Sequence, residues 1–487
     1  MRIKRVYIPD FLILKDFEIE LSTDYDLSII IGDNGSGKST LLEVIAYIFG
    51  HLHKYFVLKD KTAEFIDGYE IEFISNLKGK KYLVYIKSRY VDQKTNTFKP
   101  IIKIDDEEMS ISQIEKRFGD FSNFLPSRIG VYYAGEAPYL RSLSEHFEEK
   151  FVKDITRFDN PYSLNPLKLP KERPFFYIKE KYLGIVLLSL LARCSSNIDI
   201  KQFLKLFVGD YDENSIETKI ILKEPEWYKN KTNNLWGIKS KFVEQFVTKL
   251  FDFSSYESTG EHNKWISYNY VGLLNLTDLF SDSDKLDFPF VVFDYLLYND
   301  LLEDIEITFK LTNETKISSR RLSEGQRQFI VTNGLTILWK DHENKLFLYD
   351  EPDVFLHPKW QREFIPFLKT NLNDSCAIIT THNPALLSDV KKEQVHLLRN
   401  GKVIEKYFNT LGKKIDNILI DYFDLEDTRN KEVSELFKSL YERINKKDFN
   451  SSSFKEDIEK LKHIVGNDDL EFTMLSLQFK KANEKNK

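Results

Sequence analysis

The stretch LSIIIGDNGSGKSTLLEVIAYIF at residues 27–49 constrains the fold of this chain more than any other. An apolar, β-branched run leads into Gly32-Asp33-Asn34-Gly35-Ser36-Gly37-Lys38-Ser39-Thr40, and apolar residues then recur at helical spacing. A strand, the pattern G-x-x-x-x-G-K-[ST] and a helix, in that order, are typical of a phosphate-binding loop. In such a loop the backbone N–H groups point at phosphates, Lys38 reaches the β- and γ-phosphates, and Ser39 holds Mg²⁺. The alternative, a glycine-rich turn with an exposed lysine, would not need the flanking strand and helix.

The amino-acid composition limits the classes of protein to which this chain can belong. A hydrophobic content of 42%, with 38 Phe and 25 Tyr, is typical of a globular chain. The net charge of −6 does not favour a globally basic nucleic-acid binder, so a DNA contact would need a local basic patch or a partner. Cys194 and Cys376 stand in no metal-ligand spacing, which indicates a reduced, intracellular protein. Because the sequence contains neither a signal peptide nor a run long enough to span a bilayer, we expect a cytoplasmic protein without membrane contact.

Three later stretches place polar residues beside predicted helices and strands. Leu322-Ser323-Glu324-Gly325-Gln326 precedes an apolar-periodic helix that Ser323 can cap, so the helix N-terminus becomes an anion site. An apolar strand then ends in Asp350, which suits a Mg²⁺ ligand, and Glu351, which suits a base that polarises the attacking water. A further strand ends at His382. Taken one at a time, these features would indicate a helix cap, a surface turn and a structural histidine. Because they occur along the chain in the expected order, they indicate a single site.

The phosphate loop, LSEGQ, YDE and TTHN, in this order, resemble the motifs of the ATP-binding-cassette ATPases, particularly their soluble RecF/SMC-like and OLD-like heads, which are also grouped with AAA ATPases. By position, the resemblance assigns Walker A to Gly32–Thr40, the signature to Leu322–Gln326, Walker B to Phe347–Glu351, the D-loop to Pro352–His357 and the switch histidine to His382. Glu324 replaces the first glycine of the family's LSGGQ signature.

The resemblance also implies roles for these residues. ATP would bind at Gly32–Thr40, Mg²⁺ at Ser39 and Asp350, and catalysis would use Glu351 and His382. In the family a glutamine after a strand such as IGVYYAGE at 129–136 touches Mg²⁺; here Glu136 is the nearest polar residue. Because the signature of one subunit closes on ATP held by another, the resemblance implies a homodimer of heads, with a higher homo-oligomer expected.

The expected fold class is α/β, an ATP-binding-cassette-type head in two parts, 1–136 and 320–410. Short β-rich segments at 69–76, 81–87 and 98–105 predict an antiparallel subdomain in its first part. An inserted, mainly helical lobe is expected at 137–319, from helical patterns at 180–193, 200–208 and 238–252. A C-terminal extension at 411–487 is expected to form a helical hairpin, with Phe437 and Leu440 on one face and Leu461 on another.

The C-terminal extension indicates a more specific function than ATP hydrolysis alone. GKKIDNIL, followed by charged helical segments through GNDDLEF, resembles the C-terminal region of the PtuA family, the ATPases of Septu anti-phage systems that also accompany some retrons. This resemblance implies an ATPase subunit whose ATP-driven dimerisation gates a separate HNH-type nuclease, with DNA contacted through the complex. Residues 383–487 lack the D-x-D of a Toprim nuclease, so we expect no nuclease centre in this chain.

A RecF/SMC-like DNA-repair clamp is the alternative function. A transporter ATPase is disfavoured by the long interval between Lys38 and Leu322 and by the tail.

Overall fold

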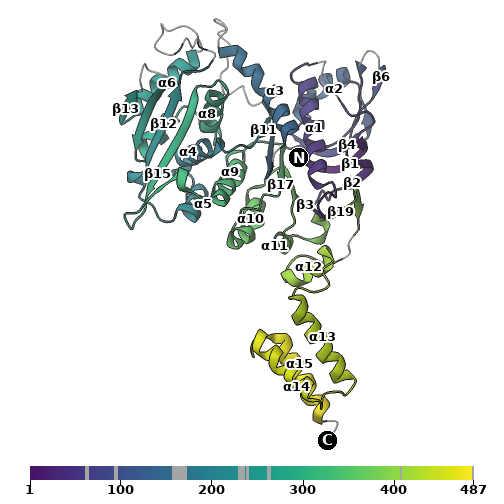
Figure 1. The fold of residues 1–487 in the computed structure, drawn as a ribbon. Coiled ribbons are helices and arrows are strands. Elements are labelled where there is room, and N and C mark those ends of the chain that lie inside the picture. Colours follow the sequence, from purple (N-terminus) through teal and green to yellow (C-terminus); the bar gives the residue numbers. More distant parts are fainter. Residues whose placement is uncertain are drawn as a thin grey trace. The chain divides into compact units, whose positions relative to one another are not determined.

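The computed structural model describes residues 1–60, 65–92, 97–135, 137–155, 173–226, 228, 236, 241–259, 265–405 and 408–484. The chain forms two compact units, Met1–Gly412 and Lys413–Lys487, and each is described by itself. Figure 1 follows them from the purple N-terminus to the yellow C-terminus.

A seven-stranded sheet forms the centre of the first unit, in the order β11-β10-β17-β18-β3-β19-β20. All neighbouring strands are parallel except β19 and β20. Every residue of β3, β17 and β18 is buried, which explains their nearly continuous apolar sequences. The bounds are β3 (Leu27–Gly32), β10 (Arg128–Tyr133), β11 (Phe175–Tyr177), β17 (Lys345–Asp350), β18 (Ser375–Thr380), β19 (Val395–Arg399) and β20 (Lys402–Ile404). Because the strands are parallel, the phosphate loop, Asp350 and Thr380 emerge at one edge.

Helices pack on this sheet through the alternating side chains of its strands. Leu346 and Leu348 of β17 belong to the core around α1 (Lys38–Phe56). Phe347 stacks on Trp339 at the end of α9 (Glu324–Leu338), on the alternate face of the same strand. Other helices of this unit are α3 (Pro138–Ile155), α10 (Pro358–Asn371) and α11 (Pro384–Leu387).

The predicted antiparallel subdomain is present, as a six-stranded sheet of order β2-β1-β4-β5-β8-β9. Its side chains join those of α1 in one continuous core. Its strands are β1 (Arg2–Phe11), β2 (Leu14–Glu20), β4 (Glu70–Leu77), β5 (Lys80–Lys87), β8 (Ile101–Ile104) and β9 (Glu107–Glu108), with the pair β6 (Tyr90–Asp92) and β7 (Thr97–Phe98) and helix α2 (Ile111–Phe118) beside them.

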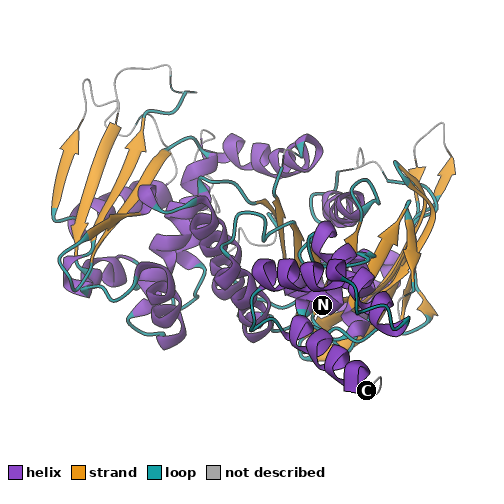
Figure 2. Ribbon diagram, turned by 60° about the horizontal axis from the view of Figure 1, so that its bottom comes forward, coloured by secondary structure: helices purple, strands orange, loops and turns teal. Residues whose placement is uncertain are grey.

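We call the segment from α4 to β16, Tyr182–Ser318, the lobe. The predicted helices appear as α4, α5 and α6, but the lobe also holds a five-stranded antiparallel sheet, β13-β14-β12-β15-β16, that the sequence interpretation missed. The orange strands of the lobe and of the antiparallel subdomain form separate groups in Figure 2, with purple helices between them. The bounds are α4 (Tyr182–Cys194), α5 (Ile198–Val208), β12 (Glu217–Lys223), α6 (Lys241–Phe253), β13 (Tyr256–Thr259), β14 (Trp265–Val271), α7 (Leu273–Leu279), α8 (Phe288–Tyr298), β15 (Leu302–Lys310) and β16 (Lys316–Ser318).

The second unit is helical, with α12 (Ile415–Phe423), α13 (Lys431–Asn445), α14 (Ser452–Val465) and α15 (Leu470–Glu484). The predicted hairpin is formed by α13 and α14, which bury Phe437, Leu440 and Leu461 as expected. Helix α15 adds Phe472 and Leu475 to the same core. The second unit therefore has a hydrophobic core of its own.

We expect Leu440→Ala to destabilise the second unit by about 2–5 kcal/mol, because it removes a fully buried side chain and leaves a cavity. Leu477→Ala is the matched control: this leucine is 53% exposed on α15, and its loss should change stability by less than about 0.5 kcal/mol. Hydrogen exchange of residues 431–484, followed by mass spectrometry, measures both variants. Equal protection in the two variants would contradict the packing described here.

Over the described ranges, none of the helices combines the length and the apolar character needed to cross a bilayer.

Candidate nucleotide-binding site

The predicted phosphate loop joins β3 to α1. Gly37 caps α1 with a left-handed backbone, φ 104°, and contributes no side-chain hydrogen bond, so the helix N-terminus is left for an anion. Gly32 lies so close to β19 that an added Cβ would stand 2.1 Å from the carbonyl oxygen of Leu398. These two positions therefore require glycine.

Lys38 is folded back over the loop. Its ammonium donates to the carbonyl oxygens of Gly32, at 3.0 Å, and Asp33, at 3.2 Å, and lies 2.8 Å from Nε2 of His382. Burial lowers the pKa of this ammonium. The direct partners of the charge are thus two carbonyl dipoles and an imidazole, and a phosphate would supply the opposite charge that they lack.

Ser39 and Asp350 meet on the metal side of the site. The Ser39 hydroxyl donates to Oδ1 of Asp350 at 2.8 Å, and the Thr380 hydroxyl donates to the same oxygen at 2.6 Å. Asp350 and Thr380 are paired in register at the ends of β17 and β18, and burial raises the pKa of Asp350. The loop and the end of Walker B are therefore already joined by direct hydrogen bonds.

The residues present fit a nucleotide with Mg²⁺. The hydroxyl of Ser36 in the loop is buried and has no hydrogen-bond partner within the described chain, as expected of a donor that a phosphate oxygen would satisfy. In that same part of the chain no group of three or more His, Cys, Asp or Glu could enclose a metal. A hydroxyl and one carboxylate, completed by water and phosphate oxygens, are the ligands that Mg²⁺ takes at nucleotide sites.

Glu351 lies at the centre of the site in a strained backbone conformation. Its φ is 49°, in the left-handed region, and its N–H donates to the carbonyl oxygen of Thr380 at 3.1 Å. The backbone N–H of His382 donates to Oε2 of Glu351 at 3.3 Å, and Nε2 of His382 lies 3.4 Å from Oε1. Burial, together with the charge of Asp353, raises the pKa of Glu351 to about 7. The structure thus brings Lys38, Glu351 and His382 into one network.

Three further polar residues belong to this site. The sequence analysis did not name any of them as a site residue. Thr380 holds Asp350, and Thr381 donates to Oδ1 of the buried Asp353 at 2.8 Å. The two threonines precede His382 in the TTHN motif, so that motif was the available signal. The third residue, Tyr133, ends β10 in register with Asp350. Glu136, the residue predicted for this position, lies outside the described residues.

The signature segment, Leu322–Gln326, forms a second group at the start of α9. Ser323 caps the helix in a capping box: its N–H donates to Oε1 of Gln326 at 2.9 Å, and its hydroxyl accepts from the Gln326 N–H at 3.3 Å. An added Cβ on Gly325 would stand 2.3 Å from the carbonyl oxygen of Phe355, so only glycine lets the helix approach the D-loop this closely. Glu324, the departure from the family pattern, lines a cavity beside this contact.

Comparison with known proteins identifies the family of this chain. The model of the AAA_21 family, described as "AAA domain, putative AbiEii toxin, Type IV TA system", matches residues 27–388. The "Retron Vc95 probable ATPase" of Vibrio cholerae serotype O1 biovar El Tor is 23% identical over 415 residues, which cover 82% of this chain and 74% of the relative. The "Septu protein PtuA" of Bacillus mycoides (strain KBAB4) is 25% identical over 302 residues, covering 51% of this chain and 42% of the relative.

Among solved structures, the SMC head domain from Thermotoga maritima is 13% identical, with a TM-score of 0.34; the match covers 84% of this chain and 100% of that one. The predicted resemblance to ATP-binding-cassette-type ATPases, with PtuA among the relatives, is confirmed by the family and relative matches. Because the family model spans most of the chain, from the phosphate loop past His382, this protein belongs to the AAA_21 family of AAA domains.

Proposed function

We propose that this chain is the ATP-hydrolysing regulatory subunit of an anti-phage defence complex, in which ATP-driven dimerisation of heads gates a separate, HNH-type nuclease. The observation that carries the enzymatic part is the network that joins Lys38, Glu351 and His382 beside the Ser39–Asp350 contact. The names of the relatives, a retron ATPase and a Septu protein, support the defence role.

Different residues of this chain would have different roles in ATP hydrolysis. The N-terminus of α1 and Lys38 would bind the phosphates, and Ser39 and Asp350 would hold Mg²⁺, which, when bound, neutralises charge on the β- and γ-phosphates. Glu351 would accept a proton from the attacking water. His382 would hold the Glu351 carboxyl through the contacts of its backbone N–H and its ring nitrogen.

The dimer would place the signature of one copy on the nucleotide of the other. The geometry that supports this is the N-terminus of α9, which Ser323 caps at the surface of the chain. Beside it, Val354 and Phe355 of the D-loop are 55% and 43% exposed, an apolar surface that a second copy would cover. A second copy of this chain is the partner that we expect on this surface. The phosphate loop and the signature form separate groups in one chain, and the shared site needs both.

We expect Ser323→Arg to prevent ATP-dependent dimerisation while each copy still binds ATP, because the arginine side chain would occupy the space of the partner's nucleotide. The Glu351→Gln background accumulates the ATP state, and light scattering after size exclusion measures the mass. Ser112→Arg, which adds the same side chain at an exposed position of α2, is the control and should dimerise normally. An ATP-stabilised dimer of the Ser323→Arg variant would refute the shared site.

The partner can be identified directly. We would express the chain with its genomic neighbours, purify it by a tag and analyse the co-purified proteins by mass spectrometry. A stoichiometric nuclease is the expected result. Recovery of the ATPase alone, together with tight and salt-sensitive DNA binding, would instead favour a DNA-repair clamp.

A further inference from the structure

A second cavity lies at the edge of the central sheet opposite to the nucleotide site. Its volume is about 910 Å³, and Arg128 and residues 341–344 line it where β10 and β17 begin. The last turn of α1, the turn between β4 and β5, the end of α2 and Lys285 of the lobe also contribute to the lining. Small-molecule sites in proteins span about 300–1,000 Å³, so the cavity is large enough for such a ligand.

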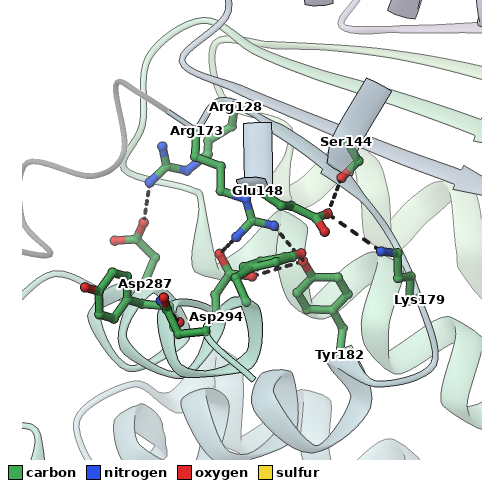
Figure 3. Close-up of polar contacts among 11 residues, drawn as sticks. Arg128, Ser144, Glu148, Arg173, Lys179, Tyr182, Asp287 and Asp294 are labelled. Carbon is green, nitrogen blue, oxygen red and sulfur yellow. Dashed lines mark hydrogen bonds and ion pairs between the residues drawn. The ribbon is translucent and has the colours of Figure 1, made fainter. Parts of the chain in front are cut away.

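The buried guanidinium of this wall, that of Arg128, is already paired (Figure 3). Arg128 is 1% exposed and donates to Oδ2 of Asp287 at 3.0 Å, and Nε2 of His342 lies 2.7 Å from the same oxygen. Burial alone would raise the pKa of Asp287, but the hydrogen bond with His342 and the charge of Arg128 hold it at about 2. Arg173, which precedes β11, is paired with Asp294 in the same way (Figure 3). The wall therefore presents compensated charges to a ligand.

Other polar groups of the lining also have partners. The amide of Asn344 donates to the carbonyl oxygen of Asn76 at 2.6 Å and accepts from the Asn76 N–H at 2.7 Å. The Ser127 hydroxyl donates to the carbonyl oxygen of Glu343. These contacts follow the general rule that buried polar groups are hydrogen-bonded.

His53 is an exception to this rule. It lies in the last turn of α1, lines the cavity and is 3% exposed, and neither of its ring nitrogens has a hydrogen-bond partner within the described chain. Burial lowers the pKa of the imidazole to about 3, and the backbone of Pro126 opposes this shift without making a regular hydrogen bond. The ring is therefore neutral at physiological pH and offers one donor and one acceptor.

Water is a poor partner for His53 in these surroundings. A buried water needs roughly two to four polar partners. Apolar side chains supply most of the cavity lining, namely Val57, Leu77, Phe118, Leu125, Pro126 and Pro174. An unpaired buried donor or acceptor destabilises a protein, and a destabilising feature of this kind is typical of a functional site.

The lining favours a flat, uncharged ligand. A neutral imidazole cannot offset a charge, and the exposed lining residues balance one another, Lys78 and Lys285 against Asp341 and Glu343. The apolar walls suit a planar ring. Nucleobases are rings of this kind: they carry donors and acceptors on their edges, and proteins bind them between apolar side chains.

We propose that this cavity is a second ligand site that binds the base of a nucleoside, with His53 as its hydrogen-bonding residue. The sugar would lie toward the exposed residues, where the carboxylates of Asp341 and Glu343 can accept from its hydroxyls. The site is separate from the phosphate loop, and the proposal does not depend on the proposed ATPase function.

The first test is isothermal titration calorimetry with adenosine, guanosine, cytidine and thymidine as separate probes. We expect one of them to bind with a micromolar Kd, and its 5′-monophosphate to bind within about threefold, because the exposed charges balance. His53→Phe keeps an aromatic ring and removes both nitrogens, so the affinity should fall about tenfold or more. His463→Phe makes the same change at an exposed position of α14 and should bind as wild type does.

Thermal unfolding without ligand distinguishes a binding role from a structural one. His53→Phe replaces two unpartnered nitrogens by carbon, so its melting temperature should equal or exceed that of wild type. If this variant does not fold, Leu77→Trp takes its place, since a larger side chain at the end of β4 would fill the cavity. It should abolish nucleoside binding and leave the ATP affinity unchanged.

Titration in the presence of saturating ATP, in the Glu351→Gln background, separates the two sites. The nucleoside should still bind. Nucleoside binding that ATP abolishes would place the base in the phosphate-loop site and overturn the second site. The absence of binding by all four nucleosides, or wild-type affinity in both His53→Phe and Leu77→Trp, would overturn it as well. These outcomes leave the ATPase proposal intact, whereas a wild-type protein that binds a nucleoside but does not hydrolyse ATP would count against the proposed function alone.

Discussion

Lys38→Ala is expected to abolish ATP binding. The wild-type ammonium is held by the carbonyl oxygens of Gly32 and Asp33, and it stands beside the N-terminus of α1, where phosphates would bind. Without it, the phosphates lose their only cationic partner from the loop itself, and charge-assisted hydrogen bonds are among the strongest in proteins.

Equilibrium dialysis with labelled ATP measures the affinity directly. Lys116→Ala, at an exposed position near the end of α2, is the control and should bind as wild type does. The melting temperature without nucleotide should stay close to wild type in the control, and ATP should raise it in the control and not in Lys38→Ala. Unchanged ATP affinity in Lys38→Ala would refute the assigned role.

Glu351→Gln is expected to bind ATP, to accumulate as the ATP-bound dimer and to hydrolyse ATP at least about 100-fold more slowly, the scale of a lost general base. The amide has nearly the shape of the carboxylate and still accepts from the His382 N–H through its oxygen. It cannot take a proton from water. The loss should therefore lie in kcat, with ATP affinity retained.

Single-turnover hydrolysis of labelled ATP separates the chemical step from product release. Glu343→Gln, an exposed residue near the opposite end of β17, makes the same chemical change away from the site and should retain full turnover. Near-normal turnover in Glu351→Gln would move the base to another residue.

The parts of the site that lie within short stretches of chain could be predicted from the sequence. The strand, loop and helix at 27–49 follow from glycine positions and apolar spacing. Asp350 ends a buried strand, Glu351 follows it, and His382 comes after a second buried strand. Parallel strands then bring their ends together at one edge, which places the phosphate loop near Asp350 and His382.

What could not be predicted depends on contacts between distant residues. The lobe sheet pairs β12 with β14 and β15, and no local pattern shows which segments pair, although the alternation in LEDIEITFK at 302–310 is itself a strand signal. The pairing of Tyr133 with Asp350 at the ends of β10 and β17 likewise depends on strand register, which residue type alone does not show. Arg128 and Asp287 are 159 positions apart, and neither stands in a recognisable motif.

Two buried ion pairs join the lobe to the chain at β10 and before β11, Arg128–Asp287 and Arg173–Asp294, and they limit how lobes can be exchanged among relatives. A chimaera that received a foreign lobe would also have to receive acidic residues at the positions of Asp287 and Asp294, or lose Arg128 and Arg173 from the recipient. Each guanidinium left buried without its carboxylate would cost about 3–5 kcal/mol, and two such losses would consume much of the stability of an ordinary domain. The lobe and the strands it holds are therefore expected to be inherited together, so that specificity for a partner diversifies on the outer surface of the lobe and not by replacement of the whole.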